Sequence, residues 1–195
     1  MENSNIKLSI LICSVDTEDR QENLKKLIHE LNVQISKNYA ESIVEVLVES
    51  DNKNISVGDK RNLLIEKSQG EYICFIDDDD FISKNYLKSI IENLGGDILM
   101  IRINHLVNGE KAKSIQTSLY IDNLETGDFI FRKNHFHLCP IKREIVNKVR
   151  FISVNWAEDL DFSQRIVPYI NNYITLDEEI YIYNDNLSKS LTRNV

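Results

Sequence analysis

The stretch that decides the fold runs from Gly70 to Phe81 and reads GEYICFIDDDDF. Residues 72–76 form a short and almost entirely apolar run, which is typical of a strand covered on both faces in a parallel sheet. Four aspartates, Asp77 to Asp80, follow this strand without a break. We therefore expect a buried strand whose carboxyl end carries a dense group of negative charges.

The residues before this strand alternate between short apolar runs, typical of strands, and segments with the spacing of helices. Residues 7–13 (KLSILIC) and 43–48 (IVEVLV) are two further short apolar runs. A polar loop is expected over 16–20, and a helix over 58–68 that Gly70 ends. The helix that precedes the second run is indicated by apolar residues at helical spacing, namely Leu24, Leu27, Ile28, Leu31 and Ile35. The order β-α-β-α-β predicts a parallel sheet, in which ligands collect at the carboxyl ends of the strands.

The second half of the chain mixes both kinds of element. Ser83 is expected to cap a further helix. Strands are predicted over 97–103, 128–131 and 173–183, and helices over 141–149 and 158–170. We therefore expect an α/β fold with a Rossmann-like mixed sheet and flanking helices, in a single compact domain over residues 1–195.

Composition and charge exclude several classes of protein. The 195 residues are 42% hydrophobic and 28% charged, as in a globular domain. With 31 acidic against 23 basic residues, the net charge of -8 argues against binding to nucleic acid or to anionic membranes. The sequence shows neither a signal-peptide core nor an apolar run of about 20 residues, so we expect a cytoplasmic protein without a membrane span. Its three cysteines are expected to be free buried thiols.

The aspartate run is the strongest chemical signal. Adjacent carboxylates repel one another, and burying them without a counter-charge is costly. Mg²⁺ and Mn²⁺ take oxygen ligands and need only one or two protein carboxylates when phosphate oxygens and water complete the shell. The run at the end of a strand therefore predicts a site for a metal–diphosphate. The alternative is a solvated acidic turn before the next helix.

These motifs resemble the family 2 glycosyltransferases of the GT-A fold. The resemblance rests on SILICSV (9–15), GDKRNLLIEKSQGEYICFIDDDDF (58–81) and WAEDLDFSQRI (156–166), which occur in the order expected for that family. It implies a nucleotide-sugar-binding half over about 1–104 and an acceptor-side half with the catalytic base over about 105–195. The chain would be a small, catalytic-domain-only member.

The resemblance also implies roles for residues on the donor side. Asp77 would contact the ribose side of the nucleotide. Asp79 would be the main ligand of Mn²⁺ or Mg²⁺, with Asp78 beside it, and the role of Asp80 stays open. Arg61 would lie near the diphosphate, where a guanidinium can pair with phosphate oxygens.

The nucleobase would be held where the first two strands end. UDP is the favoured nucleotide, because members of the family commonly use UDP-sugars. Which of Glu49 and Asp51 reaches the base stays open. The residues expected there are Ser14, Val15, Glu49, Ser50 and Asp51.

On the acceptor side, Asp159 matches the family's catalytic base and Glu158 would position the acceptor. An inverting transfer needs a carboxylate that takes the proton of the attacking hydroxyl. The acceptor would be a glycan, a lipid-linked sugar or a protein. Acidic residues in a first helical turn are also favoured by the helix dipole alone, and Arg165 could be their structural partner.

Three smaller features have two interpretations each. His135 and His137 have the spacing of a metal pair, but we favour an acceptor-side loop or ordinary packing. Trp156 could stack on a sugar ring or fill the core. Residues 186–195 could close over the diphosphate or fray.

Other classes share parts of this pattern. Phosphatases of the haloacid-dehalogenase type carry Asp-x-Asp after the first strand, whereas here the aspartates follow the third. Nucleotidyltransferases carry a glycine-rich loop after the first strand, and CSVDTEDRQ (13–21) has no glycine. A non-catalytic nucleotide- or carbohydrate-binding module is opposed by the presence of both Asp79 and Asp159.

Overall fold

The chain folds around one mixed sheet. The computed structural model describes residues 5–121, 124–133 and 135–185. In chain order the elements are β1 Leu8–Val15, α1 Glu18–Lys37, β2 Val44–Asp51, α2 Val57–Lys67, β3 Tyr72–Phe75, β4 Phe81–Ile82, α3 Tyr86–Asn93, β5 Ile98–Val107, β6 Glu110–Thr117, β7 Leu124–Thr126, β8 Phe129–Arg132, the 3₁₀ helix η1 Phe136–Leu138, β9 Ile141–Lys142, α4 Arg143–Val146, α5 Glu158–Ile166, the 3₁₀ helix η2 Val167–Tyr169 and β10 Tyr173–Asp185.

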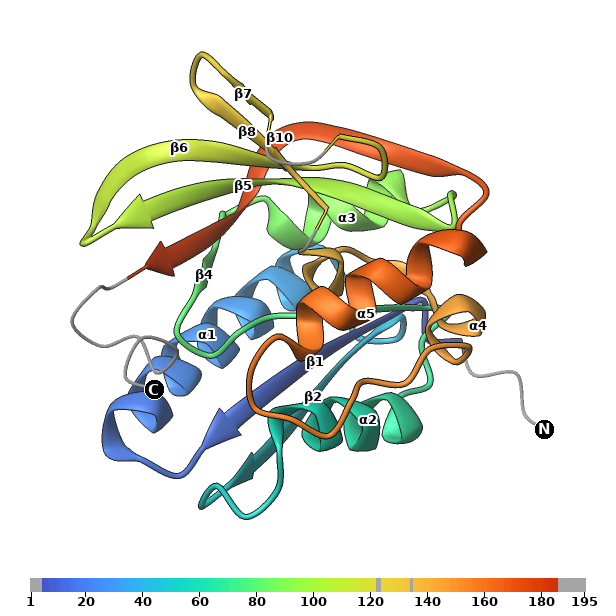
Figure 1. Ribbon diagram of the computed structural model, residues 1–195. Helices are drawn as coiled ribbons and strands as arrows, with labels where there is room; N and C mark the ends of the chain where they lie inside the picture. Colours follow the sequence, from blue (N-terminus) through green and yellow to red (C-terminus); the bar gives the residue numbers. More distant parts are fainter. Residues whose placement is uncertain (1–4, 122–123, 134, 186–195) are drawn as a thin grey trace.

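The first three long strands are parallel, as the sequence predicts. β1 lies between β2 and β3 and pairs in parallel with both. The sheet continues in the order β2-β1-β3-β9-β5-β6-β8-β7, and β10 pairs with β5 and β4. Because β9 is antiparallel to both β3 and β5, the sheet is mixed. The helices α1 and α3 contact each other, as do α2 and α5, so helices flank the sheet (Figure 1).

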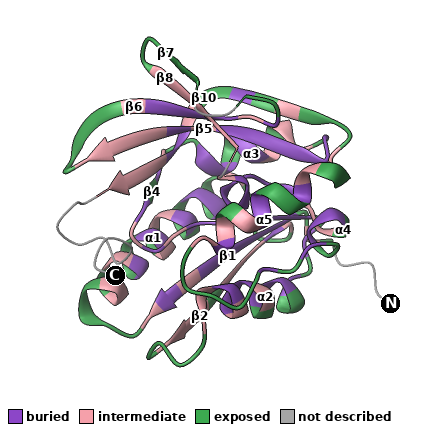
Figure 2. Ribbon diagram, viewed as in Figure 1, coloured by how far each residue is buried: buried purple, intermediate pink, exposed green. Residues whose placement is uncertain are grey.

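Burial follows from the apolar character of the central strands. Leu8, Ile10, Leu11 and Ile12 of β1 are fully buried, and the residues of β3 are buried as well. Figure 2 shows this pattern: the centre of the sheet is buried, and α1 and α2 carry exposed residues on their outer sides. Among the described helices, none combines the length and apolar character that crossing a bilayer requires. The three cysteines are free, with Cys74 and Cys139 buried and Cys13 half-buried.

Several helix boundaries differ from the sequence prediction. The polar loop expected over 16–20 is shorter, because α1 already begins at Glu18. Arg20 therefore lies in the first turn of α1. The helix α2 ends at Lys67 with Ser68 as its C-cap, so Gly70 lies beyond the cap.

The helix expected over 141–149 is replaced by the short strand β9 and the four-residue helix α4. Ile141 fills the gap between two strands, pairing with Ile73 of β3 on one side and Ile98 of β5 on the other. Its backbone is therefore needed in the sheet, and only Arg143–Val146 is helical. The helix that Ser83 was expected to cap begins at Tyr86, with Asn85 in the N-cap position and no capping hydrogen bond from its side chain. The helix predicted over 158–170 becomes 3₁₀ after Ile166.

Residues 151–157 lead into α5 and are fastened to α2. The side chain of Asn62 donates to the Phe151 carbonyl at 2.9 Å and accepts from the Phe151 amide at 3.0 Å. The Gly58 amide donates to the Val154 carbonyl at 3.1 Å. A Cβ atom on Gly58 would lie 1.8 Å from the Ile152 carbonyl oxygen, so only glycine allows this approach.

Replacing Gly58 with alanine should lower the free energy of unfolding by about 1 to 3 kcal/mol, because the backbone of the 151–157 segment must move. Urea unfolding measures this change. The matched control is Gly95→Ala, whose Cβ would meet only the Ile174 side chain at 3.4 Å. Equal stability of the two variants would show that the approach of Gly58 to Ile152 does not constrain the loop.

Candidate functional site

The four aspartates after β3 point into different surroundings. They form a tight turn, in which the Asp80 amide donates to the Asp77 carbonyl at 3.1 Å. Asp78 and Asp80 are buried, whereas Asp77 and Asp79 are half-buried. The turn directs the carboxylates toward three sets of partners: Asp77 contacts Arg61, Asp78 and Asp79 both contact Arg20, and Asp80 contacts Tyr181.

Asp78 and Asp79 share one cation. The guanidinium of Arg20 forms ion pairs with both carboxylates. The Ser14 hydroxyl donates to Asp78 Oδ2 at 2.6 Å. Burial raises the pKa of Asp78 and of Asp79, and Arg20 opposes that rise without removing it. The two residues predicted to hold a metal therefore do lie together, beside a cation that the sequence did not reveal.

Asp77 belongs to a second, buried group of charges. Arg61 Nη2 lies 3.2 Å from Asp77 Oδ1, and Arg61 Nε lies 3.3 Å from Glu158 Oε1. The guanidinium also packs on the ring of Phe75, with its centre 4.8 Å from the ring centroid. Burial would raise the pKa of Asp77, but Arg61 and His137 together hold it below its usual value. Arg61 thus connects the end of β3 to the start of α5.

The two acidic residues at the start of α5 differ in exposure. Glu158 is buried against Arg61, whereas Asp159 is half-buried and its Oδ1 accepts from the Leu160 amide at 2.8 Å. Arg165 pairs with Asp161, at 2.8 Å from Nε to Oδ2, so it is a structural partner of this acidic turn. Asp159 is therefore the more accessible carboxylate of the pair 158–159.

The predicted base pocket lies where β1 and β2 end side by side. Val15 is in register with Asp51, and Ser14 with Ser50. Lys60 is buried, donates to the Ser14 carbonyl at 2.7 Å and forms an ion pair with Asp51. The hydrogen bond from Lys60 is the main reason that the pKa of Asp51 falls to about 2. Glu49 instead pairs with Lys67 on the surface at 2.6 Å.

Asp80, whose role the sequence left open, fastens β10 to the aspartate turn. The Tyr181 hydroxyl donates to Asp80 Oδ2 at 2.7 Å and accepts from the Asp77 amide at 3.1 Å. The Asn184 amide donates to Asp80 Oδ1 at 2.8 Å. Burial raises the pKa of Asp80 well above its usual value.

The two histidines flank the same turn. His137 is buried in η1, with Nε2 3.6 Å from Asp77 Oδ2. Burial lowers the pKa of His135 to about 4, and its ring lies edge-on to Tyr183 with centroids 6.1 Å apart. Trp156 is 69% exposed, so of its two interpretations the one in which it fills the core is wrong. Residues 186–195, the predicted lid or frayed end, lie outside the described residues.

The carboxylates of this site suit a divalent metal ion that the diphosphate of a substrate helps to hold. Across the described ranges, no group of three or more His, Cys, Asp or Glu side chains is arranged to hold a metal by itself. The Asp79 side chain is 44% exposed, and hard carboxylate oxygens are ligands for Mg²⁺ or Mn²⁺. One or two carboxylates suffice when phosphate oxygens complete the shell, so the residues fit a metal carried by a diphosphate.

Sequence reasoning missed Arg20, Lys60, Tyr181 and Asn184. A local signal existed for the position of Arg20 in a first helical turn, because Thr17 followed by Glu18 and Asp19 is typical of a helix start. Tyr181 and Asp80 are 101 residues apart in the chain. No local pattern indicates such a pair.

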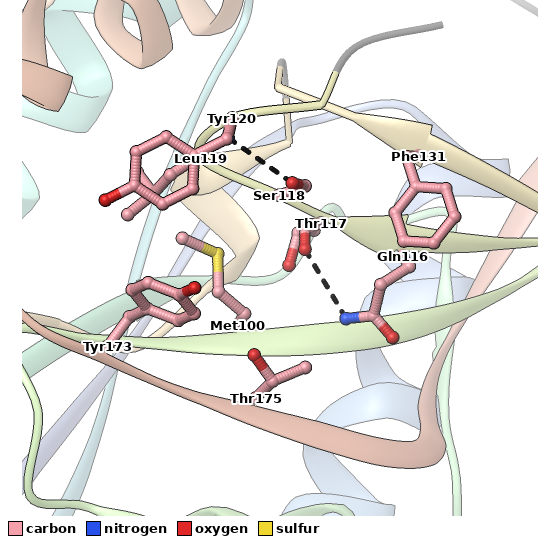
Figure 3. A pocket seen from close by; sticks show the side chains of 9 residues that line it. All are labelled: Met100, Gln116, Thr117, Ser118, Leu119, Tyr120, Phe131, Tyr173 and Thr175. Atoms are coloured by element: carbon pink, nitrogen blue, oxygen red, sulfur yellow. Dashed lines mark hydrogen bonds between the residues drawn. The ribbon is translucent and has the colours of Figure 1, made fainter. Parts of the chain in front are cut away.

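A separate pocket of about 120 Å³ lies on another part of the sheet (Figure 3). It is bounded by β5, β6, β8 and β10, and Tyr120 and Tyr173 pack edge-to-face there with ring centroids 6.1 Å apart. Its lining contains none of the predicted site residues, so it is distinct from the aspartate site.

Comparison with known proteins agrees with the resemblance found in the sequence. A family model described as "Glycosyl transferase family 2" matches residues 30–149, which include the four aspartates. An uncharacterized glycosyltransferase from Haemophilus influenzae is 32% identical over 108 residues, covering 52% of this chain and 41% of that protein. The chain thus spans less than half the length of this curated relative.

Two solved structures share the fold. The crystal structure of Staphylococcus aureus TarS 1–349 in complex with UDP matches with a TM-score of 0.64 at 19% identity, covering 92% of this chain and 60% of that one. The mannosyltransferase PcManGT from Pyrobaculum calidifontis, in complex with GDP-Man and Mn²⁺, matches with a TM-score of 0.55 at 12% identity. That match covers 90% of this chain and 56% of the mannosyltransferase.

Proposed function

The chain belongs to glycosyl transferase family 2 and has the GT-A fold, and from this premise we propose that it transfers a sugar from a nucleotide-sugar donor to an acceptor hydroxyl. UDP-sugars are the favoured donors, and the acceptor is a glycan, a lipid-linked sugar or a protein. The donor binds in the half formed by about residues 1–104 and the acceptor in the half formed by about 105–195. The transfer inverts the anomeric centre and uses Mn²⁺ or Mg²⁺.

One observation carries this proposal: Arg61 contacts both Asp77 and Glu158. Asp77 is the first of the donor-side aspartates that follow β3, and Glu158 begins the helix that carries Asp159. A single buried guanidinium therefore holds the donor side and the candidate base next to each other. This juxtaposition is what a direct transfer between two bound substrates requires.

In the proposed reaction, Asp159 takes the proton of the acceptor hydroxyl while that oxygen forms a bond to the anomeric carbon. The bond from the anomeric carbon to the diphosphate oxygen breaks, and the nucleoside diphosphate leaves with the electron pair. Asp79 and Asp78 would hold a divalent cation, which would supply positive charge to stabilise this leaving group. Glu158 acts through Arg61, which it orients toward Asp77 and the diphosphate.

For the nucleobase we favour Asp51 over Glu49 as the contact. Lys60 fixes the half-buried Asp51 carboxylate beside the end of β1 and lowers its pKa to about 2, so this carboxyl is ionised at neutral pH. An ionised carboxylate accepts from an N–H group of a base but cannot donate to one. Ser14 and Val15 complete this side of the pocket.

The test is a thermal-shift screen of UDP, GDP, dTDP and CDP with and without Mn²⁺. We expect one nucleotide to stabilise the protein only when the metal is present, because the two bind as a unit. Asp79→Ala should abolish that stabilisation, whereas Asp128→Ala, outside the site, should retain it. Stabilisation that a chelator leaves unchanged would argue against the metal site. Binding without any turnover would identify a non-catalytic module.

A further inference from the structure

Arg20 occupies a position that its charge disfavours. It lies in the first turn of α1, where the partial positive charge of the helix N-terminus repels a cation and favours the neighbouring Glu18 and Asp19. Its side chain is also only 22% exposed, so its guanidinium has lost much of its contact with water. Burial would lower the pKa of Arg20, but Asp79 and Asp78 raise it above its usual value. The two carboxylates are thus what holds the cation there.

Arg20 also changes what the carboxylate pair can bind. The Asp78 side chain is fully buried, with Arg20 on Oδ1 and the Ser14 hydroxyl on Oδ2. The Asp79 side chain is 44% exposed and contacts Arg20 through Oδ2. Two carboxylates and one guanidinium leave a single net negative charge where the divalent cation of the proposed function would bind.

We propose that Arg20 is an internal counter-cation that makes metal binding conditional on the nucleotide. With Arg20 in place, the Asp78–Asp79 pair holds a free divalent cation weakly. The diphosphate brings the additional negative charge and the oxygen ligands that the pair lacks. Metal and nucleotide therefore bind as a unit, and each raises the affinity for the other by the same factor. This inference rests on the proposed function and deepens it.

The experiment is a titration of the purified full chain with Mn²⁺ alone and with Mn²⁺ in the presence of UDP. Free Mn²⁺ is measured from its electron paramagnetic resonance signal, so the readout does not depend on activity. We expect wild-type protein to bind Mn²⁺ weakly alone and strongly with UDP. Arg20→Gln should bind Mn²⁺ alone about tenfold or more tightly than wild type, and its gain from UDP should shrink by a similar factor.

The matched control is Lys26→Gln, which removes a positive charge from the exposed side of the same helix, where Lys26 pairs with Glu22. It should leave Mn²⁺ binding unchanged. Arg20→Gln also leaves the buried carboxylate of Asp78 without its guanidinium partner. A second comparison avoids this effect by measuring Asp78→Asn alone against the double variant Asp78→Asn, Arg20→Gln. The double variant should again bind Mn²⁺ alone more tightly than the single one.

The outcomes separate the two proposals. Unchanged Mn²⁺ affinity in Arg20→Gln, together with normal UDP-dependent binding in wild type, overturns the role of Arg20 and leaves the proposed function in place. UDP binding that is indifferent to Mn²⁺ in every variant overturns the proposed metal site, and the inference with it.

Discussion

Asp159→Asn should lower the rate of sugar transfer by about 10²- to 10⁴-fold, the usual contribution of a general base. The amide cannot take the proton of the acceptor hydroxyl, whereas its oxygen can still accept the hydrogen bond from the Leu160 amide. The start of α5 should therefore keep its structure. Asp159 also makes no ion pair with the donor-side residues Arg20 or Arg61 within the described chain, so donor binding should persist.

The measurement pairs a radiolabelled sugar-transfer assay with the Mn²⁺–nucleotide thermal shift on the same protein. The matched control is Asp161→Asn, two residues further along the same helix, where the carboxylate pairs with Arg165 instead. We expect the control to retain transfer. If Asp159→Asn turned over at the wild-type rate, the base would have to be assigned to another residue.

Arg61→Met should lower the free energy of unfolding by about 3 to 5 kcal/mol, the effect of breaking a buried ion pair from one side. The Arg61 side chain is 5% exposed, and its loss removes the guanidinium from the buried carboxylate of Glu158 and from the half-buried carboxylate of Asp77. Methionine keeps the apolar stem of the side chain but removes the guanidinium, so the change reports the loss of the ion pairs together with the contact of the guanidinium with Phe75. Urea unfolding at neutral pH measures it.

The control for this loss is Arg150→Met. Arg150 pairs with Glu66, and both side chains are at least half exposed. An exposed pair contributes about 0 to 1 kcal/mol, so this variant should be nearly as stable as wild type. Adding Glu158→Gln to Arg61→Met should recover part of the loss, because one uncompensated charge disappears. Equal stability of Arg61→Met and Arg150→Met would contradict the connecting role of Arg61.

The candidate site shows which inferences the sequence can support. Asp77, Asp78 and Asp79 lie together because they are neighbours in the chain, and the strand before them fixes which edge of the sheet they occupy. Arg61 and Glu158 were each predicted to belong to the site. Their direct contact across 97 residues was not. The sequence likewise suggested Asp51 and Glu49 as equivalent candidates for the contact with the nucleobase. The structure distinguishes them, because the buried Lys60 pairs with Asp51 whereas the surface residue Lys67 pairs with Glu49.

The sequence by itself determined the β-α-β-α-β order, the parallel direction of the first three strands, and the aspartates that follow β3. These features depend on hydrophobic periodicity and on chain adjacency, which are local properties. Only the tertiary structure decided that Ile141 is a strand residue, that Arg20 pairs with both Asp78 and Asp79, and that Asp80 holds β10. Each of these depends on partners far away in the chain, because a gap in a sheet or a buried charge can be satisfied by any segment that the packed core brings within reach.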